Sequence, residues 1–237
     1  MGLPISLAII ILAALIHSSF QLSVSVLTML SSHTIGSKRT QNKLLGLTTS
    51  FLFGAALVTL LLISSLIVIL FNIFGNDAPQ IVWAGSCGLL FGVALSVWMF
   101  YYRREKGTAL WIPRGVAKYL MDRTKSTKAK AEAFGLGMSS VIGELLFIIA
   151  PLVVGALVIT TLQPFWQLIA ILIYTLVASS SLITIWMLIG GGITLGRIQK
   201  WRETNKYFLQ FIAGAGLIVL SIFVYVYEIL GTTVGGL

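Results

Sequence analysis

Two titratable side chains, an imidazole and a carboxyl, lie deep inside long apolar segments of this chain. His17 lies within AALIHSSFQLSVSVLTMLSSH, residues 13–33, and Glu144 lies within GMSSVIGELLFIIAP. A charged side chain at the centre of a lipid bilayer costs at least ~2.5–3.5 kcal/mol, so such residues normally face a partner or a water-filled cavity. A carboxyl and an imidazole that face one cavity can take up and pass on a proton, and this is the chemistry expected of Glu144 and His17.

Polar side chains follow His17 at helical spacing. In one continuous helix, with about 100° per residue, these side chains would fall within an arc of about 80° on one face. The members of this predicted stripe after His17 are Gln21, Ser25, Thr28 and Ser32. We expect the first three of them to contact a solute or gate its path. The alternative is that the hydroxyl groups only form hydrogen bonds between helices, which is common in membranes.

The segment around Glu144 offers two further candidates. Ser140 lies one helical turn before Glu144, and Pro151 lies seven residues after it. A proline inside a helix leaves a backbone carbonyl without its donor, and transporters expose such carbonyls to ions where helices are interrupted. We therefore add Ser140 and Pro151 to the predicted substrate or gating residues. The glycines at 190–192 could loosen another helix end, or could equally serve close packing.

The composition places these segments in a membrane. Of the 237 residues, 57% are hydrophobic and only 10% are charged, and the mean hydropathy is +0.99. A helix needs about 20 apolar residues to cross the ~30 Å hydrocarbon layer. The chain is therefore predicted to be an all-α integral membrane protein with six transmembrane helices. The six segments are 4–31, 44–73, 81–102, 132–160, 165–193 and 207–230.

The basic residues predict the orientation of the helices. All sixteen Lys and Arg residues lie in 32–43, 103–131 and 194–206. Cytoplasmic loops carry an excess of Lys and Arg, so these three loops should be inside and both termini outside a bacterial or archaeal cytoplasmic membrane. The net charge of +9 is then a topology signal, and nucleic acid is not an expected partner.

The longest basic loop is predicted to contain a short interfacial helix. Pro113 suits the first turn of a helix. Apolar residues recur every four positions, at Ile112, Val116 and Leu120, while the basic residues Arg114, Lys118 and Arg123 occupy other sides. Such a helix would lie on the inner leaflet, anchored by Trp111 and Tyr119, with its basic residues on membrane lipids. The alternative is a solvated basic linker.

This loop divides the chain into two halves of three segments each. The predicted organisation is a first three-helix repeat at 1–102, the basic linker at 103–131 and a second three-helix repeat at 132–237. Because each half has an odd number of spans, the halves would have inverted topology, as in many secondary transporters. The alternative is that any six-helix chain with one long middle loop divides in this way.

Several kinds of chemistry find no support in the residues. Cys87 is the only cysteine, so neither a disulfide framework nor a dithiol relay can form. No nucleophile triad, phosphate loop or dinucleotide fingerprint occurs, and we expect neither an enzyme nor a cofactor. Hard divalent cations favour several carboxylate ligands, whereas the apolar core offers only Glu144, so no metal site is expected.

Two short motifs resemble a known superfamily of membrane proteins. The segment ALIHSSFQLSVS is similar to the manganese-efflux motif, with Ser18 near the place of its aspartate, and GLGMSSVIGELL is similar to the second copy, with Ser140 there. With three spans in each half, the chain resembles the LysE superfamily, which includes amino-acid exporters, the TerC and manganese-efflux families and CcdA-type proteins. The missing carboxylates and cysteine pair disfavour the metal and thiol branches.

These observations lead to one functional hypothesis and one alternative. The hypothesis is a secondary transporter that exports a small polar or amphiphilic solute with protons, through a midplane site between the first and fourth spans. The alternative is a non-transporting membrane subunit or scaffold that binds a partner protein or lipid. The resemblance also implies that a homodimer is an expected assembly.

The predicted topology can be tested by cysteine labelling in intact cells. With Cys87 replaced by serine, we introduce single cysteines at Asn76 and Ser126. An impermeant thiol reagent should label position 76, which is predicted to be outside, and should not label position 126. The reverse pattern would overturn the orientation.

Overall fold

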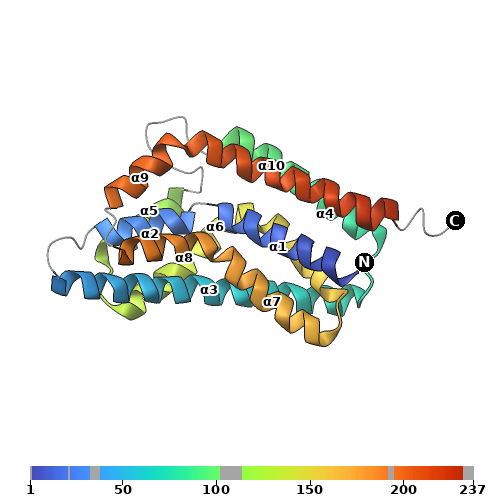
Figure 1. Ribbon diagram of the computed structural model, residues 1–237, viewed down its shortest axis with the longest axis horizontal. Helices are drawn as coiled ribbons and strands as arrows, with labels where there is room; N and C mark the ends of the chain where they lie inside the picture. The colour runs from blue at the N-terminus through green and yellow to red at the C-terminus, as the bar shows by residue number, and fades with distance from the viewer. Residues whose placement is uncertain (1, 21, 33–37, 102–113, 192–194, 232–237) are drawn as a thin grey trace.

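The computed structural model describes residues 2–20, 22–32, 38–101, 114–191 and 195–231, and the elements within these ranges are all helical (Figure 1). The predicted all-α class is therefore confirmed. The helices are α1 (Leu3–Ser19), α2 (Leu22–Ser32), α3 (Lys38–Phe74), α4 (Gln80–Phe100), α5 (Arg114–Ser126), α6 (Lys130–Thr160), α7 (Pro164–Ala178), α8 (Ser180–Gly190), α9 (Leu195–Thr204), α10 (Lys206–Val224) and the π-helical turn η1 (Tyr225–Leu230).

Four helical stretches are long and apolar enough to cross a membrane by themselves. They are Asn42–Phe74 within α3, then α4, α6, and Lys206–Leu230 formed by α10 with η1. Two further stretches qualify if each bent pair counts as one span, because α1 bends by 48° into α2 and α7 bends by 49° into α8. The helices thus coincide with the six predicted segments, and they indicate a membrane-embedded protein.

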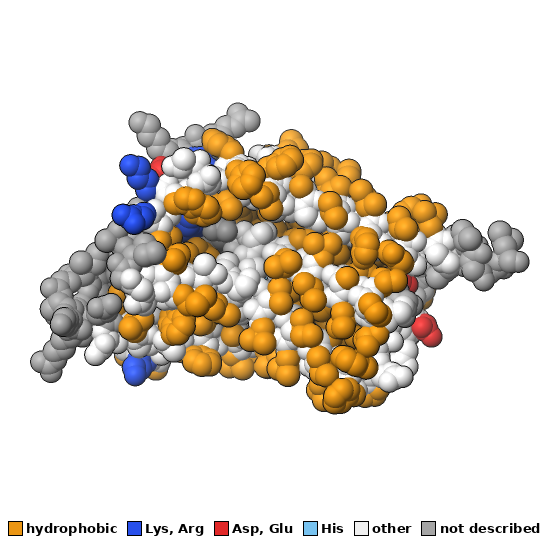
Figure 2. Space-filling view, in the orientation of Figure 1, with side chains coloured by type: hydrophobic (Ala, Val, Ile, Leu, Met, Phe, Trp, Pro, Cys, Tyr) orange, Lys and Arg blue, Asp and Glu red, His pale blue; other side chains and the backbone are white. Residues whose placement is uncertain are grey.

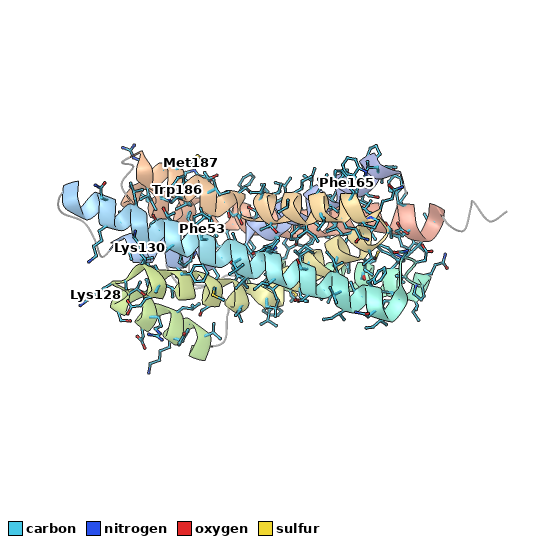
Figure 3. All side chains as sticks on the ribbon, turned by 90° about the horizontal axis from the view of Figure 1, so that it is seen from below. Phe53, Lys128, Lys130, Phe165, Trp186 and Met187 are labelled. Carbon is cyan, nitrogen blue, oxygen red and sulfur yellow. The ribbon has the colours of Figure 1, made fainter. Side chains whose placement is uncertain are left out.

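The surface has the distribution of hydrophobic and basic side chains expected of a membrane-embedded protein. Hydrophobic side chains cover most of the face seen in Figure 2, while Lys and Arg side chains lie at the end near α9 and the start of α3. Figure 3 shows Lys128 and Lys130 at the end of the bundle toward which Trp186 and Met187 of α8 also lie. Phe165 of α7 lies toward the opposite end. The paired helices α7 and α8 therefore run along the bundle as one interrupted span.

The centre of the bundle is α6, which is the most buried of the long helices and packs against α3 along much of its length. Two glycines allow the backbones of α3 and α6 to touch. A methyl group added at Gly54 would lie 2.1 Å from the carbonyl oxygen of Phe134, and one added at Gly137 would lie 2.1 Å from that of Phe51. Small residues commonly permit such close helix packing in membranes.

A second contact joins α4 to α10 through polar side chains. The Gln210 amide donates to the backbone carbonyls of Val97, at 2.6 Å, and Trp98, at 2.9 Å. The Ser221 hydroxyl donates to the carbonyl of Cys87 at 3.1 Å. Side-chain hydrogen bonds between helices stabilise bundles in which lipid is as apolar as the interface.

The helix predicted in the basic linker exists as α5, but its apolar side faces protein. Leu120 is buried, and both Val116 and Leu120 pack beside Gly143 of α6. The α5 helix therefore covers α6 with the side chains that were predicted to enter the lipid. Lys118 and Arg123 are exposed, as predicted. The side chain of Arg114 lies outside the described residues, as do Trp111, Ile112 and Pro113.

The two bent spans do not correspond under the predicted repeat. That repeat pairs the first span with the fourth, yet the bends lie in the first and fifth spans, and α6 continues without a break. The structure therefore does not show the 3+3 repeat. The glycines at 190–191 coincide with the end of α8, and Gly192 lies outside the described residues.

The backbone contact between α3 and α6 predicts a large effect of a small substitution. Gly54→Ala should lower the thermal midpoint in detergent, because its methyl group can be accommodated only if a helix shifts, a change that costs about 1–3 kcal/mol. Gly88→Ala is the matched control, since nothing lies within 4 Å of its added methyl group. Equal midpoints for the two variants would contradict this packing.

Candidate functional site

The first span is interrupted beside His17. After α1 ends, Phe20 is extended, with φ −73° and ψ 144°, and its N–H donates to the carbonyl of His17 at 3.2 Å. The Ser19 hydroxyl donates to the carbonyl of Ile16 at 2.6 Å, and such local bonds compete with helical ones. The predicted stripe on one continuous face is therefore wrong. His17 lies on α1, whereas Ser25 lies on α2, beyond the bend.

Glu144 caps the second half of this span. Its Oε1 accepts hydrogen bonds from the backbone N–H groups of Leu22 and Ser23, the latter at 3.0 Å, and its Oε2 accepts from the Ser23 hydroxyl at 2.9 Å. The first N–H groups of a helix have no acceptor within the helix, and a negative charge there is favourable. A buried carboxylate from α6 thus supplies acceptors for the first N–H groups of α2.

The fifth span has an interruption of the same kind. α7 ends at Ala178, and α8 begins at Ser180. The hydroxyl oxygen of Ser18 accepts a hydrogen bond from the N–H of Ser181 at 3.1 Å and lies 2.8 Å from the hydroxyl oxygen of Ser180. A residue at the first interruption therefore caps the helix that follows the second interruption.

The two interruptions lie at the same depth. The helices that follow the two interruptions, α2 and α8, contain 11 residues each, which corresponds to about 16 Å at ~1.5 Å per residue. This length is close to half of the ~30 Å hydrocarbon layer. For bent pairs that cross a membrane as single spans, this length predicts that both interruptions lie near the midplane.

A small cavity of about 20 Å³ lies between the interruptions. This volume is about enough for one water molecule. Apart from apolar residues, it is lined by His17, Ser18, Ser23, Thr59, Glu144, Ser179 and Ser181. The structure therefore brings His17 and Glu144, the two titratable residues singled out in the sequence, onto one buried polar cavity.

His17 is held by a tyrosine that the sequence patterns did not single out. The Nδ1 atom of His17 lies 3.2 Å from the hydroxyl oxygen of Tyr174 on α7, and both side chains are buried. Either group can donate in this bond, depending on the tautomer of His17. Gly155 of α6 leaves room for the ring, because a methyl group there would lie 2.9 Å from it. In the sequence, the only indication of this contact was a tyrosine within an apolar run.

Arg202 of α9 extends the polar site toward the basic end of the bundle. It is only 3% exposed, and its Nη2 donates to the hydroxyl of Ser25 at 2.8 Å. Sequence reasoning grouped Arg202 with the solvated cations of a loop. A weak signal was its spacing of four from Ile198, which is also buried.

The other predicted residues lie apart from the cavity. Thr28 donates to the carbonyl of Ser25 at 2.8 Å, and Ser140 donates to that of Gly137 at 2.8 Å, so both hydroxyls are bonded within their own helices. Pro151 is buried within an unbroken α6, since neighbouring helices can hold a proline-containing helix in place. None of these three lines the cavity. Gln21 lies outside the described residues.

Neither metal ligands nor relatives point to a further role for the site. Among the described residues, no three His, Cys, Asp or Glu side chains lie close enough together to hold a metal ion. No family model, curated protein or solved structure matches the chain. The resemblance to the LysE superfamily therefore remains a prediction.

The cap of α2 predicts different effects of two substitutions at one position. Glu144→Leu should lower the thermal midpoint strongly, because each buried donor left without an acceptor costs about 1–3 kcal/mol. Glu144→Gln should lower it less, since one carbonyl oxygen remains. Hydrogen exchange at Leu22 and Ser23 should accelerate in the leucine variant.

Glu203 provides the matched control for this measurement. It is an exposed carboxyl on α9, so Glu203→Leu should leave both the midpoint and the exchange at Leu22 and Ser23 unchanged. If Glu144→Leu behaved like this control, Glu144 would not be the cap of α2.

Proposed function

We propose that this chain is a secondary transporter of a bacterial or archaeal cytoplasmic membrane that carries out proton-coupled export of a small polar or amphiphilic solute. The observation that supports it most is the pair of interrupted spans that meet at one buried cavity with Glu144. Secondary transporters commonly bind solutes and coupling ions near the midplane, where half-helices begin. The site involves the fifth span as well as the first and fourth, which extends the location predicted from the sequence.

Glu144 is the proposed proton carrier. As a carboxylate it accepts three hydrogen bonds from the start of α2. A protonated carboxyl carries no charge and must donate with one oxygen, so it cannot keep all three bonds with the same strength. Proton uptake would therefore weaken the cap of α2, and proton release would restore it. This link between a proton and a half-helix is the coupling step of the proposal.

His17 and Ser25 are the proposed solute-contacting or gating residues on either side of the first interruption. Their partners, Tyr174 and Arg202, come from α7 and α9, so movement of either half of the span would change these bonds. A cavity of about 20 Å³ is closed to any solute larger than water. Entry of a solute thus requires α2 or α8 to move, as in the gating motions of alternating access.

The proposal includes the orientation of the chain in the membrane. With loops 32–43, 103–131 and 194–206 inside, Arg202 lies on the cytoplasmic side of the cavity and α1 and α7 lead to the outside. The described Lys and Arg side chains gather at one end of the molecule, as this orientation requires (Figure 2).

A second candidate function is a membrane subunit that binds a partner helix. The observation that favours it is a face of α4 on which small residues recur every four positions and are exposed, at Ala84, Gly88, Gly92 and Ser96. Such faces allow two membrane helices to approach closely. A homodimer or a different membrane protein would fit this face equally well.

Flux measurements in proteoliposomes distinguish the two functions. We expect the wild-type protein to move protons when a panel of amino acids, organic acids and amphiphiles is supplied on one side, as followed by a trapped pH-sensitive dye. Glu144→Gln should reduce this flux at least about a hundredfold, the usual lower range for losing a proton-transfer group, while the protein remains folded. His17→Gln should give an intermediate flux.

The exposed carboxyl Glu203 again supplies the control, because Glu203→Gln should transport like the wild type. A wild-type protein that is inert with every solute and co-purifies with another membrane protein would overturn the transporter and favour the subunit. Normal flux in Glu144→Gln would exclude Glu144 as the proton carrier.

A further inference from the structure

Two pockets lie one after the other along α6 beside α5, the first polar and the second apolar, and together they are called the groove here. Its α6 residues recur every three or four positions, which places them on one helix face. These residues are Glu132, Gly135 and Ser139 in the polar part and Ile142, Leu146 and Ile149 in the apolar part. The groove lies apart from the cavity of the proposed transport site and is independent of it.

The polar part has a volume of about 410 Å³ and lies between α5 and the start of α6. Its cation is the exposed Arg123, whose guanidinium carbon lies 5.9 Å from the centre of the Tyr119 ring. Arg123, and after it Ser139, hydrogen bond to Tyr119 and lower the pKa of its hydroxyl. The hydroxyls of Ser126 and Thr127 also line this part. Both of these hydroxyls donate to the backbone carbonyl of Arg123. The group here that suits a phosphate is therefore the guanidinium of Arg123.

One carboxylate also lines the polar part. Oε2 of Glu132 accepts hydrogen bonds from the backbone N–H groups of Lys128, at 2.7 Å, and Ala129, at 3.1 Å, so this oxygen is engaged at the start of α6. Residues 115–132 contain five Lys or Arg and only two Asp or Glu. Figure 3 shows Lys128 and Lys130 near the start of α6, where the side chain of Lys130 lies beside Gly46 of α3. The surroundings of the polar part therefore favour an anion despite Glu132.

The apolar part has a volume of about 380 Å³ and contains no charged residue. Val116 of α5 forms one side, and Gly143, which has no side chain, lies between Ile142 and Leu146 of α6. From Ser139 to Ile149 the helix rises about 15 Å at ~1.5 Å per residue. This is the depth of one leaflet of the ~30 Å hydrocarbon layer.

We infer that this groove binds one anionic phospholipid of the cytoplasmic leaflet, with its phosphate beside Arg123 and an acyl chain along Ile142, Leu146 and Ile149. The occupant follows from the order of the two parts. A free phosphate would leave the apolar part unused, and a soluble anion has no chain to fill it. A lipid without net negative charge would gain less from the surrounding cations.

Native mass spectrometry and thermal unfolding of the full chain in detergent test this inference. The probes are phosphatidylglycerol, phosphatidylcholine with the same chains, and inorganic phosphate. We expect the wild type to retain one phosphatidylglycerol and to gain a higher thermal midpoint from it, with smaller effects of the other two. An equal gain from inorganic phosphate or from phosphatidylcholine would overturn the inference.

Two matched pairs of variants locate the lipid. Arg123→Gln should lower the retained phosphatidylglycerol about fivefold, as expected for one cation at an anionic lipid surface, whereas Lys125→Gln, an exposed cation of α5 outside the groove, should not. Leu146→Trp should block the chain, whereas Leu168→Trp on α7 should not; these leucines are 64% and 66% exposed.

The midpoint of each variant without lipid is measured first, so that a folding defect is separated from a loss of lipid binding. Equal retention within either pair would show that the lipid does not occupy this groove. Because transport of the panel of solutes is measured separately, failure of this inference leaves the proposed function unaffected.

Discussion

The structure around the cavity depends on one constraint: a helix that restarts inside an apolar layer must find acceptors for its first N–H groups. Water is absent there, and each unsatisfied group costs several kcal/mol. The start of α2 meets this need with Glu144, and the start of α8 meets it with Ser18. Both acceptors come from other helices, so the interruptions can exist only where the first, fourth and fifth spans pack together.

The two caps differ in chemistry, because only one of them depends on a proton. Ser18 is a neutral hydroxyl whose bonds to α8 do not depend on a proton. Glu144 is titratable, so the bonds that it forms to α2 depend on its charge. In the proposed transporter, α2 is therefore the half-helix that a proton can release. Ser25 belongs to α2 and is bonded to Arg202 of α9, so a movement of α2 would change this bond.

The apolar helices could be predicted from the sequence because apolar length is a local property. The shared polar surroundings of His17 and Glu144 followed from the cost of burying titratable groups. The interruptions could not be predicted in the same way. Glu144 forms a hydrogen bond to Ser23, which lies 121 residues before it in the chain. A local sequence pattern cannot predict a cap that comes from another helix. The run Ser179–Ser181 and the pair Ser18 and Ser19 were the local signs, since hydroxyls compete for backbone bonds. Pro151 wrongly suggested an interruption of its helix, because α6 continues through it without a break.

The glycine contacts between α3 and α6 have a mechanical consequence. Where the carbonyl of Phe134 fits against Gly54 and that of Phe51 fits against Gly137, one helix cannot slide along the other without driving a carbonyl oxygen into a neighbouring side chain. These two helices therefore form a frame of fixed register. In the proposed transporter, displacement would be confined to the segments packed around this frame, and the carboxylate of Glu144, which is attached to it, would stay in place while its partners move.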